Sequence, residues 1–248
     1  MILRCESLSK SFDGTRALAE VSVEFPSSGI IAVIGPNGAG KTTLINVLTG
    51  FLRADSGRSF LGERELTGLA PHKIAGFGIG RTFQDLRLIT LVSVLENVML
   101  ARPNQKGERL LPALFRFGVA VEEKRNHEEA MRLLRFVGLA DKANELAGEL
   151  SYGQQKLLTL ACCLATEARI LLLDEPVAGV HPEMVEKILG LLSELRGQGK
   201  LVVFIEHDIA AVRQVADQVM VMDEGRIIAQ GKPAEVLERP EIIEAYVG

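Results

Sequence analysis

The stretch with the clearest chemical meaning joins an apolar run at 30–34 to a second apolar run at 44–48. It consists of Gly35, Pro36, Asn37, Gly38, Ala39, Gly40, Lys41, Thr42 and Thr43. This is the spacing of a P-loop, in which glycines let backbone N–H groups surround a phosphate chain at the start of a helix. We expect Lys41 to reach the β- and γ-phosphates of a nucleoside triphosphate, Thr42 to ligate Mg²⁺ and Thr43 to support the α-phosphate. The alternative is a glycine turn that precedes Lys-Thr by chance, and both flanks argue against it.

Two acidic side chains and a histidine follow buried strands further along the chain. Asp174 and Glu175 directly follow the apolar run 170–173. His207 comes shortly after the apolar run 201–205. Ligands of open α/β sheets bind at the carboxyl ends of the strands. There, Asp174 could hold Mg²⁺ through water, Glu175 could take a proton from the attacking water, and His207 could contact the γ-phosphate. Structural roles are the alternative, although desolvating two carboxylates without a function would be costly.

Three further sites are ambiguous when each is taken alone. Phe12 precedes a turn at 13–15 and is either an adenine-stacking ring or a core residue. Gln84 follows a predicted strand at 79–83 and either reaches Mg²⁺ or the attacking water, or is a solvated loop residue. The third site consists of Leu150, Ser151, Tyr152, Gly153, Gln154 and Gln155. Taken alone, this segment predicts only a helix N-cap at Ser151 and a turn at Gly153.

The periodicity of apolar residues predicts an α/β chain interrupted by a block of helices. The predicted strands are 2–8, 18–25, 30–34, 59–61, 79–83, 170–173, 201–205, 218–222 and 226–230. The predicted helices are the one that follows the P-loop, 91–101, 122–137, 141–150, 153–166, 182–196, 208–215, and short helices that begin at Pro233 and Pro240. The segment 110–121 is apolar without clean periodicity, and either packs under the core or faces a partner.

The composition excludes some classes of protein. The chain has 248 residues, of which 47% are hydrophobic and 24% are charged. A chain of this length and composition can bury a large core. Its net charge of −4 does not favour nucleic-acid binding. Cys5, Cys162 and Cys163 form no CxxC pair, which favours free cytosolic thiols. No apolar stretch reaches the length of a membrane span, and the N-terminus lacks a signal-peptide pattern.

Taken in order, these motifs resemble those of the ATP-binding cassette (ABC) ATPases over essentially the whole chain. In that resemblance Phe12 matches the aromatic loop, 35–42 the P-loop, and Gln84 the Q-loop glutamine. Asp174 matches the Walker B aspartate, Glu175 the catalytic base, and His207 the switch histidine. The signature motif is matched by Leu150, Ser151, Gly153 and Gln154. Within the family the chain looks like the ATP-binding subunits of branched-chain amino-acid importers, and the likeness is carried by the segments 80–84, 151–155, 205–208 and 243–248.

The resemblance implies a specific mechanism and set of partners. It implies that MgATP is bound by Lys41, Thr42, Gln84 and Asp174, and that two subunits close head to tail. Each nucleotide then lies between one P-loop and the other subunit's Ser151, Gly153 and Gln154. A second ATP-binding subunit, membrane permeases and, indirectly, a solute-binding protein are the implied partners. The chain would lie on the cytoplasmic face of the inner membrane, with a permease helix in a groove near 84–115.

Two positions depart from the general family pattern. Tyr152 stands where most members have glycine, although the importer subgroup tolerates an aromatic residue there. His181 stands in the D-loop, where Asp is common and Asn is usual in the subgroup. Because imidazole changes its charge between about pH 5 and 8, we expect His181 to make the activity depend on pH.

The resemblance implies an α/β P-loop NTPase (RecA-like) core with an N-terminal antiparallel β subdomain and an inserted α-helical subdomain. We expect one ABC domain over 1–248, with its core at 1–88 and 156–248 and its helical part at 89–155. The alternatives are a lipopolysaccharide or other export ATPase, a non-transport ABC ATPase, and a non-catalytic nucleotide sensor.

Overall fold

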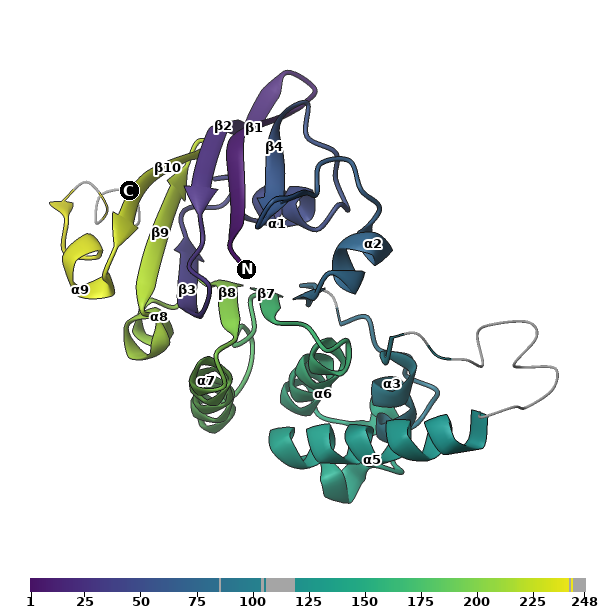
Figure 1. The fold of residues 1–248 in the computed structure, drawn as a ribbon. Helices are drawn as coiled ribbons and strands as arrows, with labels where there is room; N and C mark the ends of the chain where they lie inside the picture. Colours follow the sequence, from purple (N-terminus) through teal and green to yellow (C-terminus); the bar gives the residue numbers. More distant parts are fainter. Residues whose placement is uncertain (85, 104, 106–118, 241, 243–248) are drawn as a thin grey trace.

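The computed structural model describes residues 1–84, 86–103, 105, 119–240 and 242 (Figure 1). Two sheets, with helices packed against them, form the core of these residues. The segment 106–118, which contains most of the apolar stretch at 110–121, and the tail 243–248 lie outside the described residues.

A six-stranded sheet with the order β10-β9-β3-β8-β7-β6 forms the centre of the fold. Its strands are β3 (Gly29–Ile34), β6 (Ile79–Arg81), β7 (Ile170–Asp174), β8 (Leu201–Ile205), β9 (Gln218–Asp223) and β10 (Arg226–Gly231). All neighbouring pairs are parallel except β9 and β10, which form a hairpin around Glu224 and Gly225. The predicted strands at these positions are confirmed, although β6 ends at Arg81 rather than at Phe83.

The apolar runs of the central strands are explained by burial on both faces of this sheet. In β3, Ile30 and Ala32 belong to one core, whereas Ile31 and Val33 belong to another. The same alternation holds in β7 and β8. A strand that is covered on both sides has no polar face, which is why these segments read as continuous hydrophobic stretches.

An antiparallel sheet covers one face, with the order β2-β1-β4-β5. Its strands are β1 (Leu3–Phe12), β2 (Thr15–Glu24), β4 (Ser56–Leu61) and β5 (Arg64–Glu65). The helix α1 (Lys41–Leu48) lies in the same core. The hairpin turn of β9 and β10 joins the two sheets, because the Ala19 N–H donates to the Gly225 carbonyl at 2.9 Å.

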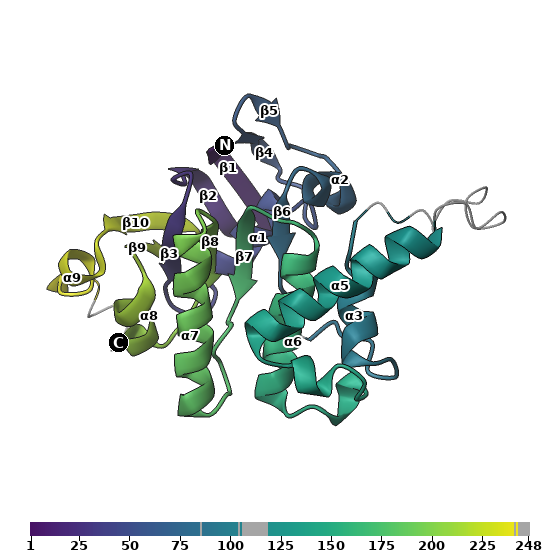
Figure 2. The same cartoon turned by 60° about the horizontal axis from the view of Figure 1, so that its bottom comes forward.

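Helices cover the other face. They are α6 (Tyr152–Ala165), α7 (Pro182–Gly197) and α8 (Ile209–Val215), with α3 (Val94–Leu100) and α5 (Val119–Val137) packed on α6. Figures 1 and 2 show α3, α5 and α6 as one group, away from β9 and β10. The short helices α2 (Pro71–Gly76) and α9 (Pro233–Val236) contact the two edge strands of the central sheet, β6 and β10 respectively.

Two predictions for the helical segment were wrong in detail. The helix predicted over 91–101 begins only at Val94, because Ser93 and Glu96 form a capping box there. The helix predicted over 141–150 is instead a pair of 3₁₀ turns, η2 (Ala140–Lys142) and η3 (Ala147–Glu149). Between them the chain pairs with the start of α3. The N–H groups of Val94 and Leu95 donate to the carbonyls of Glu145 and Ala143, both at 2.9 Å, so these carbonyls are used by a neighbouring segment.

Candidate nucleotide site

The loop between β3 and α1 has the backbone conformation that its glycines allow. Gly35, Gly38 and Gly40 have φ angles of 147°, 85° and 98°, which side chains rarely tolerate. A Cβ atom on Gly35 would collide with the Met222 carbonyl, and one on Gly40 would collide with the Ala17 carbonyl. At these two positions the space itself requires glycine, in addition to the backbone angle.

Lys41 points back into this loop from the first residue of α1. Its Nζ donates to the carbonyls of Gly35 at 2.7 Å and Pro36 at 2.8 Å, and only 6% of the residue is exposed. Burial lowers the pKa of Lys41, and the charges of Glu175 and Asp174 act in the opposite direction. The loop therefore holds a cation next to two acids at the start of a helix, which is a suitable environment for phosphate groups.

The register of the sheet brings the acids and the histidine to the same edge as this loop. Asp174 lies opposite Ile205 in the parallel pair β7 and β8, and Ile205 lies opposite Val33 of β3. The residues that directly follow β3, β7 and β8 therefore lie next to one another at the same edge of the sheet. This confirms the expectation that the P-loop, Asp174 and Glu175 share an edge with His207.

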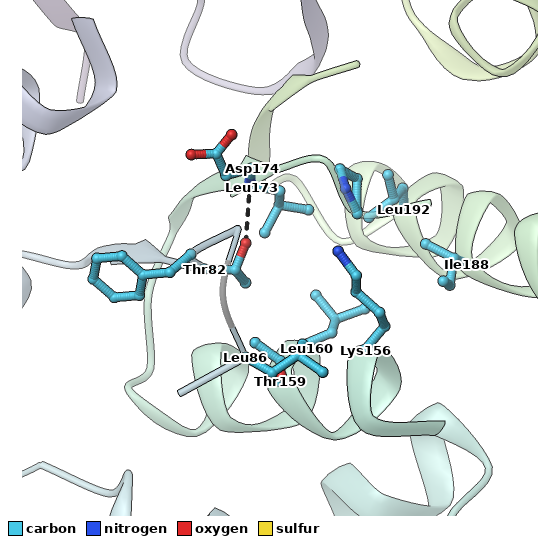
Figure 3. A pocket seen from close by; sticks show the side chains of 11 residues that line it. Thr82, Leu86, Lys156, Thr159, Leu160, Leu173, Asp174, Ile188 and Leu192 are labelled. Atoms are coloured by element: carbon cyan, nitrogen blue, oxygen red, sulfur yellow. Dashed lines mark hydrogen bonds between the residues drawn. The ribbon is translucent and has the colours of Figure 1, made fainter. Parts of the chain in front are cut away.

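Asp174 is buried and only partly satisfied. Its N–H donates to Thr82 Oγ1 at 3.1 Å, as Figure 3 shows, and its Oδ2 lies 3.5 Å from Arg81 Nη2. No hydrogen bond reaches Oδ2 from the described residues, although the atom is out of contact with solvent. Burial raises the pKa of Asp174, and the Arg81 guanidinium offsets part of that effect. A buried carboxylate oxygen without a donor fits a bound cation such as Mg²⁺.

Glu175 and His207 lie close together just beyond the ends of the paired strands β7 and β8. The distance from His207 Nε2 to Glu175 Oε1 is 3.5 Å. The His207 side chain is 40% exposed and the Glu175 side chain is 22% exposed, so both are accessible to water. The Glu175 backbone has a φ of 48°, and its N–H donates to the Ile205 carbonyl at 3.0 Å. The pair can accept a proton from water and orient an anionic group beside it.

The signature segment lies at the N-terminus of α6. Ser151 is the N-cap, and it forms a capping box with Gln154. Ser151 is exposed, and Gly153 packs so closely on Met184 of α7 that a Cβ atom would lie 2.9 Å from Met184 Cγ. The predicted N-cap is confirmed.

Four further predicted residues lie at exposed positions, whereas Thr43 is half-buried and Ala39 is buried. Phe12 ends β1 with 46% of its surface exposed, and Lys10 Nζ lies 5.5 Å from the centre of its ring. Gln84 is exposed beyond the end of β6, and Thr42 is exposed in the first turn of α1. His181 is the exposed N-cap residue of α7, without a side-chain capping bond.

Sequence reasoning missed several charged side chains buried at this edge, among them Arg81 and Glu206. Arg81 donates to Asn46 Oδ1 at 2.6 Å as well as approaching Asp174, so it connects α1 with the end of β7. Glu206 accepts from the N–H groups of Val177 and His207, at 2.9 and 3.1 Å. Burial raises the pKa of Glu206, and these N–H groups lower it in part. Both residues lie in segments that resemble the importer subunits, 80–84 and 205–208, but their buried contacts were not predicted.

Comparison with known proteins agrees with this geometry. The ABC transporter family model matches residues 18–178. The chain belongs to the ABC transporter family. Its fold agrees with that of a nucleotide-free ATP-binding cassette from an ABC transporter, with a TM-score of 0.88 and 37% identity over 100% of this chain and 99% of the other. This confirms the predicted family and fold class.

Full-length relatives of this ABC ATPase extend the comparison. It is 39% identical to a probable branched-chain amino acid transport ATP-binding protein of Archaeoglobus fulgidus, over 100% of this chain and 95% of the relative. It is 37% identical to a high-affinity branched-chain amino acid transport ATP-binding protein of Pseudomonas aeruginosa, over 100% of this chain and 98% of the relative. A bacterial ABC transporter cassette solved as a dimer matches with a TM-score of 0.79 and 26% identity, over 93% of this chain and 98% of the other. The family binds nucleotide and hydrolyses ATP. Among the described residues, no helix combines the length and the apolar character of a membrane span.

Proposed function

We propose that this chain is the ATP-hydrolysing subunit of a transporter that imports branched-chain or related amino acids. It associates peripherally with the cytoplasmic face of the inner membrane through permease subunits, and a solute-binding protein delivers the substrate. The observation that carries the proposal is the common sheet edge of the P-loop, Asp174, Glu175 and His207. The full-length similarity to branched-chain amino acid transport ATP-binding proteins supports the choice of substrate class.

The residues at this edge divide the work of hydrolysis. Backbone N–H groups of the loop 35–43, in which Pro36 has none to donate, bind the phosphates together with the Lys41 ammonium, and Phe12 stacks on the base. Thr42, Gln84 and Asp174 hold Mg²⁺, which neutralises phosphate charge when it is bound. Glu175 accepts a proton from water as the water oxygen bonds to the γ-phosphorus. The bond to the bridging oxygen breaks, ADP leaves with that electron pair, and His207 orients the γ-phosphate.

Two copies, or this chain and a homologous one, form the working unit. Ser151, Gly153 and Gln154 of one subunit cover the γ-phosphate that the other subunit holds in its P-loop. The exposure of Ser151 at the start of α6 and the dimeric form of a related cassette support this arrangement. Binding of ATP closes the pair, and hydrolysis opens it again.

Phosphate release from MgATP by wild-type and Glu175→Gln chains tests the catalytic part. We expect the variant to bind ATP, to lose about 10²–10⁴ in rate, and to accumulate as a dimer, because it lacks the general base. Glu194→Gln, which changes an exposed carboxylate on α7, is the matched control and should keep the wild-type rate. A Glu175→Gln chain with wild-type turnover would contradict the assignment.

Purification from native membranes in mild detergent tests the transport part. We expect two hydrophobic permeases and a solute-binding protein to copurify, and the solute-binding protein to bind leucine, isoleucine or valine. Recovery of export components would favour the lipopolysaccharide or other exporter alternative. Recovery of ribosomal or DNA-repair components would favour a non-transport ATPase.

A further inference from the structure

Lys156 is a buried lysine on α6 that the mechanism above does not use. Only 8% of it is exposed, and its Nζ donates to the backbone carbonyl of Glu175 at 2.7 Å. Figure 3 shows its side chain extending from α6 into a pocket whose other wall carries Leu173 and Asp174. Because burying an ammonium group is costly, this contact has to compensate for the water that Lys156 loses.

Glu175 has a backbone that needs such support. Its φ of 48° lies in the left-handed region. This conformation costs a residue with a side chain about 1–2 kcal/mol. The Glu175 N–H donates to the Ile205 carbonyl at 3.0 Å. The Glu175 carbonyl accepts from Lys156 Nζ at 2.7 Å and, at the longer distance of 3.4 Å, from the Ala178 N–H. The first bond comes from the sheet and the second comes from α6, so the direction of the Glu175 side chain depends on both.

The helix that supplies this second bond also carries the signature segment. Lys156 lies one helical turn after Tyr152, so the two side chains share a face of α6. The centre of the Tyr152 ring lies 5.5 Å from Lys156 Nζ. This distance allows a cation–π contact. The ring also lies beside the loop before α7, because a Cβ atom on Gly179 would be 3.4 Å from Tyr152 Cε1. Tyr152, the departure from the common glycine, covers Lys156 on the side of this loop.

We propose that Lys156 is a positioning residue that holds the carboxylate of Glu175 in place from α6. This proposal rests on the function proposed above, in which Glu175 is the general base. Since Ser151 caps the same helix, a shift of α6 that breaks the bond from Lys156 leaves the Glu175 carbonyl with only the longer bond from the Ala178 N–H. The base of one nucleotide site is then set by the helix whose N-terminus meets the nucleotide of the other subunit.

The test compares Lys156→Met, Lys156→Arg and Lys200→Met with wild type, as full-length chains hydrolysing MgATP. Methionine keeps most of the volume of lysine and removes the donor, whereas arginine keeps a cationic donor. Lys200 is the matched control because its Nζ also donates to a backbone carbonyl, that of Ala168, at 2.5 Å, but at the opposite end of β7. The measurements are kcat, KM for MgATP and the melting temperature.

We expect Lys156→Met to lower kcat by about 10- to 100-fold, as a displaced catalytic group does, with KM changed by less than about threefold. Lys156→Arg should recover most of kcat, and Lys200→Met should change neither constant. A merely structural lysine would lower the melting temperature of both methionine variants without this separation of kcat from KM. If Lys156→Met does not fold, Lys156→Gln, whose polar head is too short to reach the carbonyl, should show the same loss of kcat.

Two outcomes overturn the proposal in distinguishable ways. If wild type hydrolyses ATP and the folded Lys156→Met or Lys156→Gln variant has a kcat within about twofold of it, the positioning role is wrong and the proposed function stands. If wild type itself releases no phosphate, the proposed function fails and the inference fails with it.

Discussion

Replacing Arg81 by methionine should destabilise the protein strongly. The side chains of Arg81 and Asp174 are 6% and 2% exposed, with Nη2 3.5 Å from Oδ2. Removing one partner of a buried ion pair costs about 3–5 kcal/mol, because the other charge stays buried without compensation. Arg81 also donates to Asn46 and Thr49 and lies over the Phe83 ring at 4.6 Å, so methionine loses these contacts as well.

Thermal unfolding measures this effect directly. At roughly 2–4 °C per kcal/mol for a chain of this size, Arg81→Met should melt about 6–20 °C below wild type. The double variant Arg81→Met/Asp174→Asn should recover at least about half of that loss, because it no longer buries an unpaired carboxylate. Arg132→Met is the control. The side chains of Arg132 and its partner Glu129 are 59% and 32% exposed. A pair this exposed should be worth no more than about 1 kcal/mol.

The reasoning is refuted if Arg81→Met melts within about 2 °C of wild type, which would correspond to less than about 1 kcal/mol. It is also refuted if the double variant is no more stable than Arg81→Met alone. In that case the loss would come from the aromatic and hydrogen-bond contacts of Arg81 rather than from the charge of Asp174.

Two further predictions concern the loop glycines and the cysteines. Gly40→Ala should lower both ATP affinity and melting temperature more than Gly38→Ala, because a Cβ atom at Gly40 collides with the Ala17 carbonyl whereas one at Gly38 meets nothing within 4 Å. ATP titration and thermal unfolding compare the two variants, and equal effects would contradict the steric argument. Burial raises the pKa of the buried Cys5 and Cys163 to about 12, so at about pH 8 a thiol reagent should modify these two thiols about a thousandfold more slowly in the folded chain than in urea. The folded pKa of each buried thiol exceeds its unfolded value, so keeping the thiol protonated contributes to the free energy of unfolding. This contribution is complete below about pH 9 and is lost as the pH rises towards 12. Fast labelling of the native chain would contradict the burial of these thiols.

The sequence was most informative where function depends on a local backbone pattern. The P-loop glycines could be assigned because their φ angles and close approaches are properties of one short segment. The strand before Asp174 could be predicted because burial on both faces removes every polar residue from 170–173. The capping box at Ser151 likewise depends only on residues within one helical turn.

What sequence reasoning missed depends on contacts between distant segments. Arg81 and Lys156 are cations whose partners are distant in the chain, so neither role is visible in its own neighbourhood. The helix α2 was missed because its N-cap, Ala70, offers no side-chain acceptor. The 3₁₀ turns replaced a predicted helix because the carbonyls between them bond to α3, which no local propensity indicates.

The strands β3, β8 and β7 end in register with one another, and this restricts the insertions and deletions that the chain can accept. Deleting one residue within β7 would exchange which leucines face each layer, because successive side chains of a strand point to opposite sides. The same deletion would draw the acid pair about 3.3 Å away from Lys41. The spacing inside these three strands must therefore stay constant for a nucleotide to meet all of its contacts together.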